Sequence, residues 1–338
     1  MSTLEAKTQL VRLDDRVGVN ISDAASYDAV MAAAGFDFNV EKTPVLDTEG
    51  KEISGHFNIR RSDTKQTFAI MRKRYTAIPM EEMFRPFHTM VEEYGAEYES
   101  AGLIGGGKKA WISAKLKDSF TLKNRANDKV DNRMMAFGSN DGTKRNAYFG
   151  ISHRIHCNNQ LRTIMQKATE SDYWISHTKN WKAQLELARK GFEAALRGLK
   201  EFEKIANLLD QKNMTSDQCR GFATQLLPDP ERQKDEKGKE IEVRTTSRLS
   251  NRREAIVDLF ANGAGNLGAT RWDALNGLTE WVNHHNNAGK LEKQGRQAAE
   301  RRLVSTLMGG PQDQLMQRGL RLLVDTKKFD KVAQTVEA

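Results

Sequence analysis

Lysines alternate with a tryptophan along one predicted strand, residues 108–117. Because successive side chains of a strand point to opposite faces, one face carries Lys109, Trp111, Ser113, Lys115 and Lys117. The other face carries Ala110, Ile112, Ala114 and Leu116. Single-stranded nucleic acid is bound by this chemistry, with cations on the phosphates and an aromatic ring stacked on a base. A buried tryptophan ringed by lysines that reach the solvent is the alternative.

A second predicted hairpin repeats this arrangement. On its returning strand one face carries Asn146, Tyr148, Ser152 and Arg154, and the other carries Ala147, Phe149, Ile151 and Ile155. Two neighbouring strands, one offering Lys and Trp and the other Tyr and Arg, would form a binding platform. We therefore expect Trp111 and Tyr148 to stack on bases while the cations hold the backbone.

A basic segment without an apolar period joins the two hairpins and contains Lys123, Arg125, Lys129 and Arg133. It is either an arm that closes over a bound strand or a plain surface loop. Taken together, the sequence predicts nucleic-acid contacts by Lys108, Lys109, Trp111, Lys115, Lys117, Lys123, Arg125, Lys129, Arg133, Lys144, Arg145, Tyr148 and Arg154.

One glycine-rich segment is similar to a nucleotide-binding loop. Gly102, Gly107 and Lys108 reproduce most of a phosphate-binding P-loop. Lys109, however, replaces the Ser or Thr that would hold magnesium, and a strand follows where a P-loop must open a helix. A glycine-rich hairpin turn explains the same residues.

Four residues have the types of metal ligands: His153, His156, Cys157 and His177. Their spacing matches no known metal motif, and alternation along a strand places His153 and His156 on opposite faces. No catalytic grouping stands out from the rest of the sequence either. The sequence therefore predicts no metal, no cofactor and no catalytic residue, and we expect a protein that is not an enzyme.

Positive charge is concentrated in the part of the chain that holds the predicted contacts. Residues 105–167 contain thirteen Lys and Arg but four Asp and Glu, a net charge of +9, whereas the whole chain carries +8. Lys and Arg near phosphates displace condensed counterions and so drive association with polyanions. A solvated basic surface without a ligand is the other interpretation. The concentration favours nucleic acid as the partner.

Composition is that of a globular protein from a reducing compartment. Hydrophobic residues make up 38% and charged residues 29% of the 338 residues. Cys157 and Cys219 alone are too few for a disulfide framework. No run approaches the ~18 apolar residues of a spanning helix, and no secretory signal is recognised at the start. We expect a cytoplasmic protein without a membrane partner.

The predicted elements give an α+β fold. Residues 1–26 are predicted to be a flexible lead-in, and residues 27–178 an antiparallel, strand-rich domain with one packed helix. This domain would hold all the predicted nucleic-acid contacts. Within it, residues 158–167 carry a helical pattern.

The second half of the chain is predicted to be all-α with one long helix. From Trp181 to Leu209, apolar residues recur at spacings of four and three, which indicates a single apolar seam. The seam suits a coiled-coil pair or docking onto a neighbouring sheet. We expect a long and a short helix over residues 179–227, a mobile polar loop over 228–250 and a helical region over 251–338.

Two passages resemble signatures of a known family. RIHCNNQL, residues 154–161, and TRWDALNGLTEWVNHHN, residues 270–286, are similar to motifs of the phage/plasmid-like proteins that share domain of unknown function 932. The resemblance covers roughly residues 28–326, and His156 and Gln160 depart from the family pattern. It implies a mobile-element or prophage origin and supplies no catalytic residues. The order of strands and helix is also similar to the RecT-like and Red-beta-like single-strand annealing proteins, a likeness of fold alone.

The leading hypothesis is a homo-oligomeric protein that binds single-stranded DNA and anneals it in phage or plasmid recombination. Phage or host recombination proteins would be its further partners. One alternative is an interaction protein that counters host defence, with the helical half as its working surface. The other alternative is a metal-dependent nuclease whose ligands are not recognised.

Overall fold

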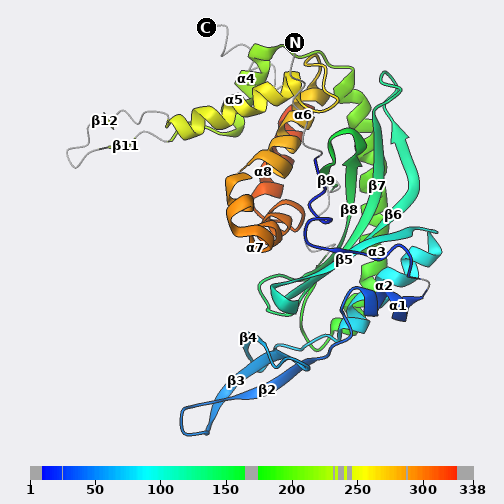
Figure 1. Cartoon of the computed structure of the whole chain (residues 1–338), viewed down its shortest axis with the longest axis vertical. Helices are drawn as coiled ribbons and strands as arrows, with labels where there is room; N and C mark the ends of the chain where they lie inside the picture. Colours follow the sequence, from blue (N-terminus) through cyan, green and yellow to red (C-terminus); the bar gives the residue numbers. More distant parts are fainter. Residues whose placement is uncertain are drawn as a thin grey trace.

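The computed structural model describes residues 10–24, 26–163, 174–230, 233–234, 240–241, 246–286 and 288–325 (Figure 1). A large antiparallel sheet forms its centre, with strands in the spatial order β1 (Val19–Asn20), β5 (Glu97–Ile104), β6 (Lys109–Thr121), β7 (Lys129–Ser139), β8 (Asn146–Arg154) and β10 (Trp174–Ile175). A further strand, β9 (Asn159–Thr163), also pairs with β8. The 3₁₀ turns η1 (Gly105–Gly107) and η2 (Ile155–Cys157) reverse the chain after β5 and β8.

Helices α1 (Tyr27–Ala33), α2 (Met80–Glu93) and α3 (Trp181–Asp210) contribute to the apolar core on one face of this sheet. α1 begins where the Ser26 side chain accepts a hydrogen bond from the backbone N–H of Ala29 at 3.2 Å. α2 continues through Pro86, although proline removes a helical hydrogen bond. Phe84 and Phe87 are buried in this core, so packing fixes the helix.

The opposite face of the sheet is covered by α7 (Ala288–Leu307) and by the N-terminal segment. Leu303 and Leu307 of α7 share one apolar cluster with Leu13, Val17 and Trp111. The prediction of a flexible lead-in is therefore wrong for residues 10–24. These residues gain burial only against the finished sheet, a contact that local composition does not reveal.

The helical half packs around the second part of α3. Its elements are α4 (Ser216–Leu226), α5 (Ser247–Asn262), α6 (Arg271–Glu280), the π-helical turn η4 (Trp281–His285) and α8 (Pro311–Val324). The predicted seam of α3 is confirmed where its side chains are described. Phe192 and Leu199 lie in the core beside the sheet, and Phe202 and Leu209 lie in the helical core. The seam thus docks onto the sheet and the helical core within one chain.

A small separate sheet projects from one end of the molecule (Figure 1). It consists of β2 (Val40–Leu46), β3 (Glu52–Arg61) and β4 (Thr67–Arg72), all antiparallel, with β3 in the middle. β4 pairs with β3 only as far as His56, so the tip of this sheet is a hairpin of β2 and β3.

The predicted α+β architecture is confirmed, with local corrections. Residues 159–163 form strand β9 instead of a helix, because Asn158 adopts a left-handed backbone with φ 51° and returns the chain along β8. The remaining residues of that predicted helix, 164–167, lie outside the described residues. Within the predicted loop 228–250, β11 (Gln233–Lys234) pairs with β12 (Glu240–Ile241), and α5 already begins at Ser247. Residues 231–232, 235–239 and 242–245 of that loop lie outside the described residues.

Candidate nucleic-acid interface

Trp111, the predicted stacking residue, is completely buried. Alternation assigned it to the correct side of β6, opposite Ala110 and Ile112, but that side is covered by α7 and the N-terminal segment. The indole is so enclosed that a Cβ added to Gly18 would lie 2.6 Å from the ring. The prediction that Trp111 stacks on a base is therefore wrong.

Tyr148 is also buried, and it lies on the other face of the sheet. It pairs across the strands with Ala136, which pairs with Ile112 and not with Trp111. Its hydroxyl donates to the backbone oxygen of Met83 at 2.8 Å. The predicted platform of Trp111 and Tyr148 is excluded, because the sheet separates the two rings.

Arg133 and Arg154, predicted to contact phosphates, are buried ion-pair partners. Arg133 lies 3.6 Å from an oxygen of Asp14 and also contacts Glu99. Arg154 donates to both oxygens of Asp128, at 2.7 and 2.6 Å. A guanidinium held by a buried carboxylate is not available to a ligand, so both predictions are corrected. The cause is tertiary, since the carboxylates lie far from these arginines in sequence or on another strand.

Arg125 ties the loop between β6 and β7 to the helical half. Its guanidinium donates to Asp210 at 2.5 Å and to Asp273 at 2.6 Å. Burial alone would raise the pKa of Asp273, but hydrogen bonds, first among them those from Arg125, hold it below its usual value. The backbone N–H of Lys123 adds a 2.9 Å hydrogen bond to Asn207. The loop is therefore anchored, and the idea of an arm closing over a bound strand is wrong.

The other predicted cations of the β6–β7 hairpin reach the surface. Lys115 and Lys129 share Asp131, at 2.7 and 3.7 Å, so their charge is partly neutralised. Lys117 and Lys123 are exposed. These four lysines remain candidates for weak, peripheral contacts.

The remaining predicted cations belong to a larger group at the opposite end of this hairpin. Four segments meet there: residues 72–76 after β4, 108–109 at the start of β6, 140–145 between β7 and β8, and 177–179 before α3. We call their eight basic residues the basic cluster: Arg72, Lys73, Arg74, Lys108, Lys109, Lys144, Arg145 and Lys179. All of them are exposed or half-buried.

Hydrogen bonds hold the four segments together. The Tyr75 hydroxyl donates to the backbone oxygen of Asn140 at 3.1 Å. The backbone N–H of Asn140 donates to the oxygen of Lys108 at 2.7 Å, and that of Thr76 donates to the oxygen of His177 at 3.1 Å. The cations of the basic cluster are therefore presented on a fixed backbone, although they come from distant parts of the sequence.

The electrostatics of the basic cluster are strongly positive. Its four segments contain one acidic residue, Asp141, whose Oδ2 lies 2.5 Å from Lys109 Nζ. Burial would raise the pKa of Asp141, but hydrogen bonds led by that from Lys109 lower it. The pKa of nearby Lys42 is lowered by partial burial and by the charge of Lys73.

An aromatic pair lies beside these cations. The rings of Tyr75 and His177 stack with centroids 4.8 Å apart and an interplanar angle of 13°. Burial lowers the pKa of His177, which favours the neutral imidazole. Sequence reasoning missed Arg72, Lys73, Arg74, Tyr75 and Lys179. The run of three basic residues followed by a tyrosine is a usable signal, but it directly follows the apolar residues of a strand-like segment, QTFAIM, and so does not stand out.

The four residues with metal-ligand types are separated in the structure. His153 bonds to Asn158, His156 to the oxygen of Asn127 and His177 to that of Thr76. Cys157 is buried, and burial raises the pKa of its thiol to about 12. Over the described part of the chain, no three His, Cys, Asp or Glu residues gather as metal ligands would.

Fold and site together define a class of protein. It is an α+β protein in which both faces of the central sheet are covered and a basic cluster lies at one end of the sheet. Residues 67–306 match the family model described as Domain of unknown function (DUF932), and the chain belongs to that family. Comparison with curated proteins found no match, and neither did comparison with solved structures. Across the described ranges, no helix has the length and apolar character to cross a membrane.

Proposed function

We propose that this protein binds nucleic acid, and single-stranded DNA in particular, through the basic cluster. The observation that carries this proposal is the convergence of eight Lys and Arg from four segments, with Asp141 as the single acid among those segments. Flexible cations on a fixed backbone suit a polyanion, because each phosphate contact releases a condensed counterion. Binding needs no chemical step, so we propose a binding protein and not an enzyme.

The preference for single strands is supported by the stacked pair of Tyr75 and His177. Unpaired bases present an aromatic face, whereas the bases of a duplex are already stacked. A ring pair among phosphate-binding cations suits the unpaired form. The two rings are half-buried, so we expect contact from the exposed ring edge and not full intercalation.

A more specific proposal is a homo-oligomeric annealing protein that acts in phage or plasmid recombination. It is supported by the resemblance of the family motifs to phage/plasmid-like proteins and by the strand-rich order similar to RecT-like proteins. Annealing would follow if neighbouring subunits presented two complementary strands through their basic clusters. Its direct measurement is the rate at which complementary labelled strands pair with and without the protein.

Binding of labelled oligonucleotides in EDTA tests the proposal. We expect saturable binding of single strands, weaker binding of a duplex of the same length and no cleavage. Absence of binding to either form would refute the proposal and favour the interaction protein that counters host defence. Cleavage that appears only after a divalent metal is added would favour the nuclease instead.

A further inference from the structure

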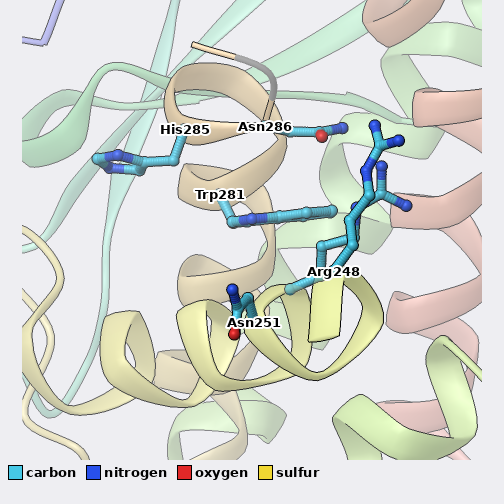
Figure 2. A pocket seen from close by; sticks show the side chains of 6 residues that line it. Arg248, Asn251, Trp281, His285 and Asn286 are labelled. Carbon is cyan, nitrogen blue, oxygen red and sulfur yellow. The ribbon is translucent and has the colours of Figure 1, made fainter. Parts of the chain in front are cut away.

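A polar groove lies at the helical end of the molecule, where α5 meets the π-helical turn η4. It measures about 380 Å³ and is lined by Arg248, Asn251, Arg252, Trp281, His285 and Asn286 (Figure 2). The basic cluster lies at the other end, near the small sheet (Figure 1). The groove is therefore a separate site with its own chemistry.

One wall of the groove is the first part of α5. Arg248 and Arg252 are four residues apart, so they project from the same side of the helix about one turn from each other. The start of α5 is fixed by Thr246, whose hydroxyl accepts from the backbone N–H of Leu249 at 3.3 Å. Further along, Ile256 and Phe260 are fully buried. The two guanidiniums thus come from a rigid support.

The facing wall is the π-helical turn. Arg302 donates to the backbone oxygens of Asn283 and His284 at 3.1 and 3.2 Å and thereby fixes the end of the turn. Trp281 is mostly buried in the helical core and turns its ring edge to the groove (Figure 2). The turn contributes Trp281 and His285 to the groove, and Asn286 follows it directly.

The side chains of the groove match the parts of a nucleotide. Planar guanidiniums bind phosphate oxygens through paired, charge-assisted hydrogen bonds. The exposed carboxamide of Asn251 offers a donor and an acceptor, as the polar edge of a base requires, whereas the carboxamide of Asn286 donates to Gln312 Oε1 at 3.0 Å. In Figure 2 the indole of Trp281 lies between these two carboxamides and extends toward the arginine side. A volume of about 380 Å³ is within the range of small-ligand pockets.

From this juxtaposition we infer that the groove binds a nucleoside phosphate, with the phosphate on Arg248 and Arg252 and the base against Trp281. The ligand is a free nucleotide or the phosphorylated end of a strand, which share this chemistry. The inference goes beyond the proposed function, since it concerns another site and does not require the basic cluster. Neither site supplies residues to the other.

Calorimetric titration of the full chain in EDTA tests the inference, with adenosine 5′-monophosphate as the probe and adenosine and inorganic phosphate as comparisons. We expect the monophosphate to bind one site per chain, at least about tenfold more tightly than either comparison. The double variant Arg248→Ala/Arg252→Ala should weaken that binding by about tenfold or more. The triple variant Arg72→Ala/Lys73→Ala/Arg74→Ala should leave it unchanged, so the two sites are separated.

Oligonucleotides with a 5′-phosphate or a 5′-hydroxyl show whether the ligand is the phosphorylated end of a strand or a free nucleotide. A preference for the phosphorylated end that the double variant abolishes supports the strand end, and binding of the monophosphate without such a preference supports the free nucleotide. The inference is overturned if the protein shows neither, or if either response survives in the double variant. Because loss of two arginines could disturb α5, Arg248→Lys/Arg252→Lys is measured too. It keeps the charges but not the paired geometry, and it should bind the monophosphate more weakly at unchanged melting temperature.

Discussion

Trp111 is enclosed on every side, and its enclosure determines what its removal would cost. Trp111→Ala should lower the free energy of unfolding by about 3 to 5 kcal/mol, because a large cavity would remain between the sheet and α7. Binding of single strands by the folded fraction should not change. Urea unfolding and oligonucleotide titration on one preparation check this. If the variant had normal stability but bound single strands weakly, the result would contradict the buried position of Trp111 and support its stacking on a base.

His153 makes folding stability depend on pH. Burial lowers the pKa of its imidazole to about 4, from about 6.5 in the unfolded chain. The depressed pKa means that the unfolded chain takes up the proton first as the pH falls. The stability associated with the neutral ring is therefore fully present above pH 6.5 and is lost between about pH 6.5 and pH 4. Between pH 7 and pH 5, His153→Gln should lose less stability than the natural protein.

The neutral ring donates from Nε2 to Asn158 Oδ1 at 2.9 Å, a hydrogen bond that the amide of glutamine can replace. Urea unfolding at several pH values compares the two proteins. Equal losses in both would mean that other groups carry the acid sensitivity of the fold in this range.

For single residues, the sequence predicted the direction of a side chain better than it predicted what surrounds that side chain. Alternation correctly placed Trp111 opposite Ile112, because side-chain direction is a local property of a strand. It could not show that α7 and residues 10–18, far away in sequence, cover that face. The same limit applies to Arg133 and Arg154, whose carboxylate partners become visible only after folding.

Among the elements, α3 contributes to both apolar cores. A charge introduced into its seam should therefore destabilise the fold more than a charge introduced elsewhere on the helix. Phe192 is buried and packs on Tyr94, with ring centroids 5.2 Å apart. Phe192→Asp should unfold the protein or lower its stability by several kcal/mol, because an unpaired carboxylate would enter an apolar core. Thermal melting checks this, with Glu193→Asp, whose side chain is only partly exposed, as a neighbouring control. Normal melting of the Phe192 variant would contradict the docking of α3.

The loop between β6 and β7 offers a second test at this scale. Arg125→Ala would leave the buried carboxylates of Asp210 and Asp273 without their cation and should cost about 3 to 5 kcal/mol. Exposed Lys123, two residues away, provides the control, and Lys123→Ala should leave stability unchanged. Urea unfolding of both variants decides the matter. An unaffected Arg125 variant would show that the loop is not anchored to the helical half.

Elements with a clear period were predictable, and elements set by pairing were not. The seam of α3 and the hairpins around η1 and Asn140 follow from patterns within single segments. β9 does not, because Asn159–Thr163 forms a strand only by pairing with β8 after the turn at Asn158. The end of β4 at Arg72 is likewise set by its pairing with β3. The sequence alone therefore does not show that residues 72–74 leave the strand and form a basic surface.

For the whole molecule, the charge concentration in the sequence was only partly a surface property. Buried ion pairs take up Arg125, Arg133 and Arg154. Residues 72–74 and Lys179 lie outside the basic stretch of the sequence, yet they join Lys108, Lys109, Lys144 and Arg145 at one end of the fold. Net charge along the chain therefore predicted a polyanion partner, which binding experiments have to test, whereas the position of the basic cluster required the tertiary structure.

The most direct test of the account is the salt dependence of single-strand binding by two matched triple variants. Arg72→Ala/Lys73→Ala/Arg74→Ala removes three charges from the basic cluster, and Lys200→Ala/Lys204→Ala/Lys212→Ala removes three exposed charges elsewhere. On single strands each phosphate contact contributes about −0.7 to the slope of log affinity against log salt. We predict that the first variant flattens the slope by about 1 to 2 and weakens binding, while the second keeps the natural slope. Equal slopes in the two variants would contradict binding through the basic cluster.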